Sequence, residues 1–444
     1  MKSIVSEGDV TRRSFLKTTG KAGVGLSVLG GLGIERCAYA AGDDTIKLAL
    51  VGCGGRGSGA ADAALTTGNV KLVAMADAFE TRLKSSLMEL NKKHPDKVDL
   101  NGVQQFVGFD AYKKAIAQAD IAILATPPGF RPLHFEEAVL QGKNAFLEKP
   151  VATDASGVRR VLAASEEAKK KGLKVGVGFQ RHHSANYLEA YQRIRDGAIG
   201  DIVEMRVYWR GGSRGGQPHL PGETEMQFQI RNWYFFTYLS GDHIVEQHCH
   251  NIDIGNWFKG THPIRATGIG GRQSRTSKEC GQIFDHHYVE FEYADGTRMY
   301  SQCSQFPSKW SRVAEAIRGT KGTADFNDRN IFEIKGPTPW RRDTPPKNAY
   351  QVEHDDLFAA IRKGDPYNEA DYAAHSTMTA IMGRMSTYSG REIEWDEAFN
   401  CQVSLVPAGL NFESEPPVKP DANGFYPVAH PGKTTPCEDI SWTS

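Results

Sequence analysis

The chain has 444 residues, and its 53 Lys and Arg balance 53 Asp and Glu, so its formal net charge is zero. This length exceeds one compact domain, and the charge balance argues against a protein whose main task is to bind nucleic acid. No apolar stretch reaches the roughly 20 residues that a membrane-spanning helix needs. We therefore expect a globular protein of about two or three domains, without a membrane span.

The first 40 residues have the pattern of a targeting signal. Residues 11–17 read Thr-Arg-Arg-Ser-Phe-Leu-Lys, a glycine-rich, weakly apolar stretch follows at 22–34, and Ala38-Tyr39-Ala40 offers a small-x-small cleavage site. A basic, an apolar and a cleavage region in this order are typical of a signal peptide, and the paired arginines resemble the twin-arginine export signal. We predict a twin-arginine signal peptide at 1–40 and a protein that is periplasmic or secreted. A cytosolic amphipathic helix is the alternative.

Short apolar runs alternate with helical patterns from residue 44 to residue 179. The runs lie at 46–51, 71–76, 121–125, 144–147 and 174–179, and the helical patterns at 58–65, 81–93, 133–141 and 156–170. Strands that alternate with helices of this length are typical of βαβ units. We predict an α/β fold that begins with a Rossmann domain, built on a parallel sheet, at 44–179.

The pattern changes after residue 180. Longer, alternating strands are expected at 202–209, 287–293, 298–303 and 312–317, with a hairpin turn at 293–297 and helices at 242–258, 354–363 and 372–389. We predict an α+β domain at 180–400 with a large, mostly antiparallel open sheet, across which the last two helices pack. Residues 401–444 form a Pro-rich extended tail, which wraps either its own domain or a neighbouring subunit.

A glycine-rich turn follows the first strand and opens the first helix. Gly52, Gly54 and Gly57 have the spacing of the dinucleotide-binding turn. Asp77, twenty residues after Gly57 at the end of the second strand, is the acidic residue expected on the ribose hydroxyls. A carboxylate there repels a 2′-phosphate, so NAD is favoured, although Arg82 nearby leaves NADP open.

Two further segments carry groups suited to moving a proton. Lys149, in the Glu-Lys-Pro triplet that ends a strand, can donate a hydrogen bond to a substrate hydroxyl. On a helix, Glu246, His250 and Asp253 share one face, and a carboxylate that orients an imidazole is a general-base arrangement. A buried polar helix is one alternative. The other is a metal site made of His243, His248 and His250.

These motifs together resemble the Gfo/Idh/MocA oxidoreductase family, over nearly the whole chain after residue 40. The motifs are 52–57, Ala-Thr-Pro-Pro at 125–128 with His134, Gly142-Lys143, the Glu-Lys-Pro triplet and 250–253. The resemblance implies a Rossmann domain and an open-sheet domain that forms a homo-oligomer, a dimer or tetramer. It assigns the family's lysine to Lys149, its catalytic histidine to His250 and its aspartate to Glu246, a departure that lengthens the side chain by one methylene.

Two sets of binding residues follow from the motifs. The expected cofactor residues are Gly52, Gly54, Gly57, Asp77, Arg82, Thr126, Pro127, His134, Glu148 and Lys149. The expected substrate residues are His182, His183, Arg231, Trp233 and Tyr234. Aromatic faces with polar tips suit sugar rings, although ordinary core aromatics would give the same pattern.

An exported enzyme cannot rely on exchanging its cofactor, because free NAD is scarce outside the cytoplasm. We predict an exported NAD(P)-dependent oxidoreductase that acts on a sugar or glycoside hydroxyl and holds its cofactor tightly. The alternatives are an NAD-dependent redox glycosidase and a non-catalytic sugar-binding protein. No metal is expected. Six scattered cysteines after residue 40 permit one disulfide in an oxidising compartment without indicating which.

Overall fold

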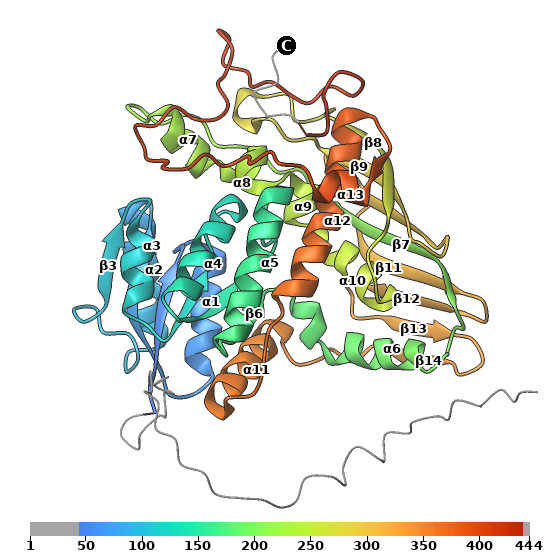
Figure 1. The fold of residues 1–444 in the computed structure, drawn as a ribbon, viewed down its shortest axis with the longest axis horizontal. Coiled ribbons are helices and arrows are strands. Elements are labelled where there is room, and N and C mark those ends of the chain that lie inside the picture. Colours follow the sequence, from blue (N-terminus) through green and yellow to red (C-terminus); the bar gives the residue numbers. More distant parts are fainter. Residues whose placement is uncertain (1–43, 438–444) are drawn as a thin grey trace, which may run out of the picture. The chain divides into compact units, whose positions relative to one another are not determined.

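The computed structural model describes residues 44–437, so the predicted signal peptide lies outside the described residues. Its first sheet is parallel, with strand order β3-β2-β1-β4-β5-β6 (Figure 1). The strands are β1 (Ile46–Val51), β2 (Val70–Asp77), β3 (Gln104–Val107), β4 (Ile121–Leu124), β5 (Asn144–Leu147) and β6 (Val175–Val177). The helices between them are α1 (Gly55–Thr66), α2 (Glu80–Lys93), α3 (Ala111–Ala117), α4 (Arg131–Leu140) and α5 (Ala155–Lys170). The predicted parallel sheet is confirmed.

Burial explains which strands could be recognised in the sequence. All four residues of β4 are buried, as in a strand covered by helices on both faces. The edge strand β3 reads Gln-Gln-Phe-Val and is mostly exposed, so it lacks an apolar run and was not predicted. The last predicted strand, 174–179, is shorter than expected, because the chain leaves the sheet after Val177 and enters the short helix η2 (Gln180–His183).

The second sheet has nine strands in the order β14-β13-β12-β11-β7-β10-β9-β8-β15. They are β7 (Ile202–Gly211), β8 (Arg265–Gly271), β9 (His286–Glu292), β10 (Arg298–Gln305), β11 (Arg312–Gly319), β12 (Thr323–Asn327), β13 (Phe332–Lys335), β14 (Trp340–Arg342) and β15 (Ile393–Glu394). Only β7 and β10 pair in parallel among its described strands. The predicted, mostly antiparallel sheet is therefore confirmed, as is the hairpin turn, where Tyr293 N donates to Thr297 O at 2.9 Å.

Helix α12 (Ala370–Ser389) joins the two sheets. It packs on β8 and β9 of the second sheet and also on α5 beside the first sheet. Almost every residue of α12 is buried, because both of its sides are covered. One apolar core cluster accordingly includes Leu147 of β5 and Phe291 of β9. Helix α6 (Ala185–Arg195) lies between β6 and β7 in the chain.

Two predicted helices differ from the structure. The helix expected over 242–258 is broken into α9 (His243–Glu246) and α10 (Cys249–Lys259), separated by Gln247 and His248. Helix α11 (Ala349–Lys363) was expected on the second sheet, but it packs against α1 and β6. Its apolar face, Leu357, Phe358 and Ile361, belongs to the core of the first sheet.

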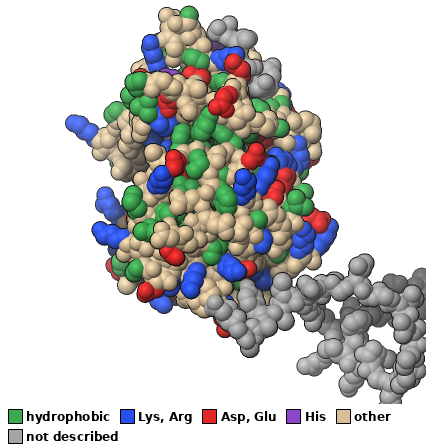
Figure 2. All heavy atoms as spheres, turned by 90° about the vertical axis from the view of Figure 1, so that its left-hand side faces the viewer, with side chains coloured by type: hydrophobic (Ala, Val, Ile, Leu, Met, Phe, Trp, Pro, Cys, Tyr) green, Lys and Arg blue, Asp and Glu red, His purple; other side chains and the backbone are tan. Residues whose placement is uncertain are grey.

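The C-terminal tail lies on its own chain. Figure 1 shows it running along α7 (Glu225–Arg231) and α8 (Thr237–Ser240). Leu405, Val418 and Tyr426 of the tail are buried in an apolar cluster with Phe228 and Phe236. On the face that Figure 2 shows, hydrophobic side chains gather near the centre, flanked by charged ones.

No helix among residues 44–437 is long and apolar enough to cross a membrane. The six cysteines of the described chain are all free, so the one disulfide that the sequence permits is not formed there.

Candidate functional site

The turn between β1 and α1 is built by glycines. Gly52 has a φ of +96°, and a Cβ there would lie 2.5 Å from Thr126 N. A Cβ at Gly57 would lie 1.9 Å from the carbonyl oxygen of Gly52, so α1 packs directly on the turn. Nothing lies within 4 Å of a Cβ placed on Gly54, the N-cap of α1, which leaves open space at the helix N-terminus. The three positions therefore have the geometry that a bound diphosphate requires.

A cavity of about 730 Å³ opens over this turn. Its walls include Asp77, Phe79 and Tyr112 from the first sheet's side, together with Ile230 and Trp233. Its charged lining residues are Arg56, Asp77, Arg82, Glu89 and Arg214. Three arginines against two carboxylates suit an anionic ligand, and Arg214, in the irregular stretch after β7, carried no motif from which it could be predicted.

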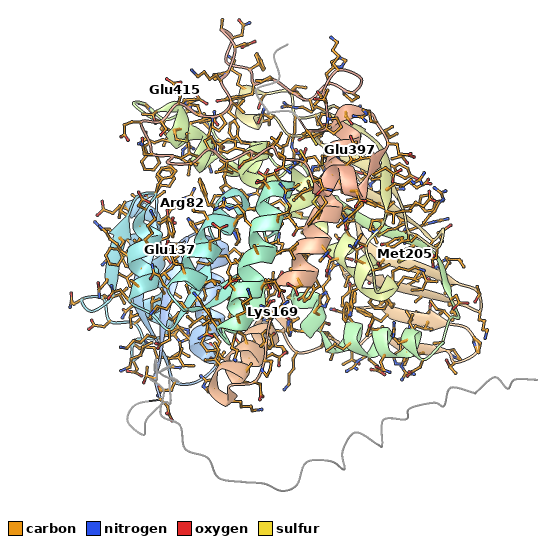
Figure 3. All side chains as sticks on the ribbon, in the orientation of Figure 1. Arg82, Glu137, Lys169, Met205, Glu397 and Glu415 are labelled. Carbon is orange, nitrogen blue, oxygen red and sulfur yellow. The ribbon has the colours of Figure 1, made fainter. Side chains whose placement is uncertain are left out.

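Asp77 holds the glycine turn as well as facing the cavity. Its Oδ2 accepts from Cys53 N at 2.7 Å and its Oδ1 from Phe79 N at 2.9 Å. Burial raises the pKa of Asp77, although both backbone donors act to lower it. Each carboxylate oxygen keeps a second lone pair for a ligand hydroxyl. Arg82 lies at the end of α2 that faces the α7 segment, where it shares a shallow hollow with residues 220–223 and Arg231 (Figure 3).

Asp77→Ala should weaken NADH binding by roughly 10–100-fold, because a hydrogen bond to a charged acceptor contributes about 1.5–3 kcal/mol. The variant should also discriminate less against NADPH, since the repelling carboxylate is gone. Fluorescence titration with both cofactors measures this, and Asp110→Ala is the control, because that carboxylate is 82% exposed. Unchanged NADH affinity in Asp77→Ala would show that this carboxylate does not bind the ribose.

The segment after β4 forms another wall of the cavity, through Thr126, Pro127 and His134. Thr126 Oγ1 and His134 Nδ1 are hydrogen-bonded at 3.1 Å, and burial lowers the pKa of His134 to about 3. Arg131, in the same segment, is almost completely buried. No motif in the sequence marked it as a site residue. Its guanidinium donates to the carbonyl oxygens of Thr126 and Glu148, which ties together the ends of β4 and β5. Burial lowers the pKa of Arg131 to about 10.

Glu148 and Lys149, predicted to touch the cofactor, do not line the cavity among the described residues. Glu148 reaches it indirectly, since its Oε1 lies 2.7 Å from Nε of Arg56, which does line it. Lys149 Nζ donates to Glu246 Oε1 at 3.0 Å and also to the Glu246 carbonyl oxygen. Burial by itself lowers the pKa of Lys149, but the nearby Glu246, Cys249 and Glu148 together outweigh burial, with Glu246 contributing most, and the pKa is raised. The lysine is therefore a charged hydrogen-bond donor.

His250 is a neutral, buried imidazole. Burial lowers the pKa of His250 well below its ordinary value, and the positive charges of Lys149 and Arg181 lower it further. Its ring lies near-parallel to Trp209 at 6.0 Å between centroids and edge-on to Phe179 at 5.7 Å. Its Nδ1 has no hydrogen-bond partner within residues 44–437. It is therefore able to accept a proton from a ligand.

Glu246 does not orient His250 as the single predicted helix implied. The break at residues 247–248 puts the two residues in different helices, and the Glu246 carboxylate binds Lys149 instead. Asp253, the third residue of the expected face, accepts from Ser376 and lies 2.8 Å from His182 Nε2. Glu246 Oε2 has no partner within the described chain. Unpaired buried oxygens are costly, so this atom marks a place for a ligand donor.

The predicted substrate residues lie in several places. Trp233 lines the cavity, and Tyr234 lies behind it, with its ring edge-on to Trp233 at 5.7 Å. His182 stacks between Trp257 and Tyr372, and His183 is bound by Asp356 and Glu369. Arg231 is held by Glu223 and faces the separate hollow beside Arg82. Of the five, only Trp233 lines the cavity among residues 44–437.

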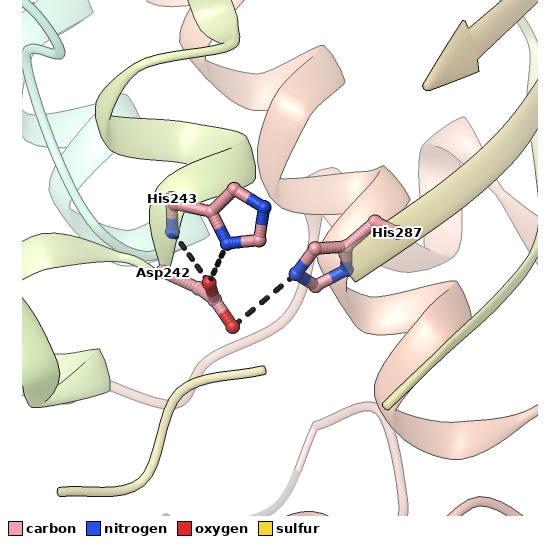
Figure 4. Close-up of side chains that lie close together, drawn as sticks. All are labelled: Asp242, His243 and His287. Carbon is pink, nitrogen blue, oxygen red and sulfur yellow. Dashed lines mark hydrogen bonds and ion pairs between the residues drawn. The ribbon is translucent and has the colours of Figure 1, made fainter. Parts of the chain in front are cut away.

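The histidines of the alternative metal site do not converge within the described residues. His248 Nε2 bonds Ser301 Oγ at 2.8 Å, and the group with metal-like spacing is instead Asp242, His243 and His287 (Figure 4). All three are buried. Asp242 accepts from His243 N and Nδ1, and its Oδ2 lies 3.3 Å from His287 Nε2.

Hydrogen bonds account for this group, which we call the Asp242 hub. Thr387 Oγ1 donates to the Arg384 carbonyl, so it accepts from His287 Nδ1 at 2.9 Å. His287 Nε2 faces the Asp242 carboxylate at 3.3 Å and has no hydrogen-bond partner within the described residues. Burial raises the pKa of Asp242, but the two histidines beside it, His287 and His243, together outweigh burial and hold that pKa well below its ordinary range. Phe284 N and Tyr388 Oη also donate to Asp242 Oδ2, so the hub joins α9, α12 and the start of β9.

We expect the free energy of unfolding to decrease already in mildly acidic solution, below about pH 6.5. Buried histidines whose pKa is lowered are His134, His243, His248, His250 and His354. Below about pH 6.5 they bind protons only in the unfolded state, so the free energy of unfolding should fall by up to ~1.4 kcal/mol per histidine per pH unit. His183, whose pKa is raised, opposes only part of this. Urea unfolding at pH 7.5 and 5.5 tests it. His354→Gln, outside the cavity, should reduce the slope, and equal stability at both pH values would contradict the prediction.

Comparisons with known proteins agree with this geometry. Residues 46–179 match the oxidoreductase family described as having an NAD-binding Rossmann fold, and residues 187–325 match the GFO/IDH/MocA C-terminal domain. Inositol 2-dehydrogenase of Rhizobium meliloti is 23% identical over 72% of this chain and 90% of its own length. Inositol 2-dehydrogenase of Klebsiella pneumoniae strain 342 is 37% identical over 45% of this chain and 52% of its own.

Solved structures share the fold. The scyllo-inositol dehydrogenase of Lactobacillus casei with bound NAD(H) and scyllo-inositol has a TM-score of 0.61 at 20% identity, and the match covers 79% of this chain and 99% of that one. The aldose-aldose oxidoreductase of Caulobacter crescentus has a TM-score of 0.62 at 17% identity, with the same coverage. About a fifth of this chain therefore has no counterpart in these structures.

Proposed function

Since the chain belongs to the Gfo/Idh/MocA family of NAD-binding oxidoreductases, we propose that it oxidises a hydroxyl group of a sugar, glycoside or cyclic polyol. The observation that carries the proposal is one buried cluster, in which Lys149 donates to Glu246 at the end of α9 and His250, in the first turn of α10, keeps an Nδ1 without a partner in the described chain. The inositol dehydrogenases among its relatives support a polyhydroxylated substrate.

The cluster divides the work of alcohol oxidation between two residues. Bound NAD would accept the hydride from the substrate carbon. Lys149 donates a hydrogen bond to the reacting oxygen and stabilises its developing negative charge. His250, neutral at its depressed pKa, takes the hydroxyl proton. Because that pKa lies well below the ordinary value, the rate should decline only at pH values clearly below about 6.5.

Glu246 has a supporting role in this mechanism. Its Oε1 fixes the ammonium of Lys149, and its unpaired Oε2 is free to accept from a second substrate hydroxyl. A substrate with neighbouring hydroxyl groups could accept from Lys149 through one hydroxyl and donate to Glu246 Oε2 through the other. A polyol or sugar ring has this arrangement, which a simple alcohol lacks.

The cofactor proposal is NAD held tightly, with NADP less favoured. Asp77, Gly54 and the open N-terminus of α1 support the dinucleotide, and the Asp77 carboxylate disfavours a 2′-phosphate. Protein purified without added cofactor should release NAD(H) on denaturation, near one per chain. Less than about a tenth of that, with no stabilisation by added NAD, would contradict tight retention; at about 100-fold over Kd, added NAD should contribute about 2.7 kcal/mol.

One experiment separates the proposed reaction from its alternatives: incubation of the protein with a panel of polyols, sugars and glycosides in D₂O. A keto product without released aglycone supports the oxidoreductase. Deuterium next to the oxidised carbon together with a released aglycone supports the redox glycosidase. Binding without either product supports a sugar-binding protein. A chelator should have no effect, because the mechanism uses no metal.

Export and assembly are separate proposals. The arginine pair and the cleavage pattern before residue 41 support a twin-arginine signal peptide and a periplasmic or secreted enzyme. Replacing Arg12 and Arg13 by Lys should keep the protein in the cytoplasm, as cell fractionation would show. The nine-stranded sheet supports a homo-oligomer, since strand β8 exposes 73% of Ile269. Light scattering should give the mass of a dimer or tetramer, and Ile269→Glu should lower it.

A further inference from the structure

A phenylalanine of the C-terminal tail completes an aromatic wall beside the cofactor cavity. Phe79, Phe109 and Phe130 line the cavity. The ring of Phe412 contacts the first two, with centroids 5.3 Å from Phe79 and 5.0 Å from Phe109. Phe109 meets Phe130 edge-on at 6.0 Å. The tail ring therefore packs directly against the rings that would face the ligand.

The chain before Phe412 is anchored to the first sheet's side of the cavity. Leu405 N donates to Asp154 Oδ2 at 2.7 Å, and Asp154 also caps helix α5. Val406 packs on Gly129 so closely that a Cβ at Gly129 would lie 2.8 Å from Val406 Cγ2. These contacts fix the path of the tail just beside the segment after β4, which forms a wall of the cavity.

Phe412 is anchored to the other side as well. Its carbonyl oxygen accepts from Thr224 Oγ1 at 2.9 Å, and Thr224 is the N-cap of α7. Ile230 at the end of α7 and Trp233 after it line the cavity. The tail thus links the two segments that meet across the cavity.

We infer that residues 405–412, which we call the clasp, retain bound NAD by closing the adenosine end of its site, with Phe412 as the central contact. Asp77 marks that end, because the carboxylate after β2 receives the ribose hydroxyls. Phe79 follows it by two residues, so the rings that touch Phe412 lie where the adenine would stack. Release of the cofactor at this end requires the clasp or its rings to move. The inference adds a retention device to the NAD site on which it depends.

The test is the release rate of NADH from the full chain, followed by fluorescence after mixing with excess NAD. Phe412→Ala should release NADH about tenfold faster or more, as expected when a central aromatic contact is truncated. Phe425→Ala is the matched control: it makes the same change in the same tail, at a ring that is 43% exposed and outside the cavity lining. Its release rate and its kcat should equal those of the unaltered protein.

An unchanged rate in Phe412→Ala, or an equal rise in both variants, would overturn the clasp while leaving the NAD site intact. If the unaltered protein binds no NADH, the cofactor assignment itself fails, and the clasp with it. Phe412→Leu retains most of the apolar volume, so it tests the same role if the Ala variant does not fold. It should fold with an unchanged melting temperature and release NADH at an intermediate rate, whereas a rate equal to that of the unaltered protein would contradict the role of the ring.

Discussion

Lys149→Ala and His250→Ala should each lower kcat by roughly 10²–10⁴-fold, the usual size of general acid–base effects. Loss of Lys149 removes the charged donor that stabilises the reacting oxygen, and loss of His250 removes the neutral proton acceptor. Neither residue lines the cavity over the glycine turn, so NADH affinity should remain. Steady-state kinetics and an NADH titration on each variant measure the two quantities separately.

Controls make this expectation specific. Glu246→Gln keeps a side chain of the same size next to Lys149 and should reduce kcat less than Lys149→Ala, because Glu246 positions the ammonium and does not carry the proton. Loss of the Glu246 charge also removes the largest of the causes that raise the pKa of Lys149, so the alkaline limb of the rate profile should move to lower pH. A His250→Ala variant with near-normal turnover would exclude it as the base, and the proton acceptor would then be sought at His248 or His182.

Asp242→Asn should destabilise the protein by about 3–5 kcal/mol, because it breaks the buried pair with His287 and sets an amide NH₂ among groups that donate to the carboxylate. The substitution keeps the size of the side chain, and the backbone strain at this position is the same for Asn as for Asp, so lost charge explains the effect. Urea unfolding measures it. Glu80→Gln is the control for an ion pair at the surface, where Glu80 and Lys84 are about 60% exposed, and it should cost less than about 1 kcal/mol.

The backbone at Asp242 allows a second comparison. Its φ of +73° with ψ of 162° is strained for any residue except glycine, at about 1–3 kcal/mol. Asp242→Gly relieves that strain but removes every hydrogen bond that the Asp242 carboxylate accepts. The loss is the larger quantity, so this variant should also be destabilised. If Asp242→Gly were more stable than the unaltered protein, the hub would contribute less than the strain it imposes. Combining Asp242→Asn with His287→Gln should cost less than the sum of the two single changes, because the two side chains form one pair.

The sequence by itself determined the features whose cause is local. Gly52, Gly54 and Gly57 follow a strand at the spacing that the turn demands, and the structure has a positive φ at Gly52, close contacts at Gly52 and Gly57, and open space at Gly54. The apolar run at 121–125 predicted a parallel strand, found as β4, and the alternation at 287–293 predicted a strand of the open sheet, found as β9. The glycine turn and these strands each follow from a short motif, an apolar run or an alternation of apolar and polar residues. Such patterns lie within a few consecutive residues.

The tertiary structure alone decided which distant groups meet. A helical period over 242–258 put Glu246 and His250 on one face, but the Asp242 hub fixes the start of α9 against α12 and the segment before β9, and the chain breaks before α10. Glu246 consequently pairs with Lys149, 97 residues away. The tail has no period to read, so nothing in it predicted that Phe412 would pack beside the cofactor cavity. These contacts depend on burial and charge pairing between segments far apart in the chain. Local sequence patterns do not show which of several distant groups a side chain will contact.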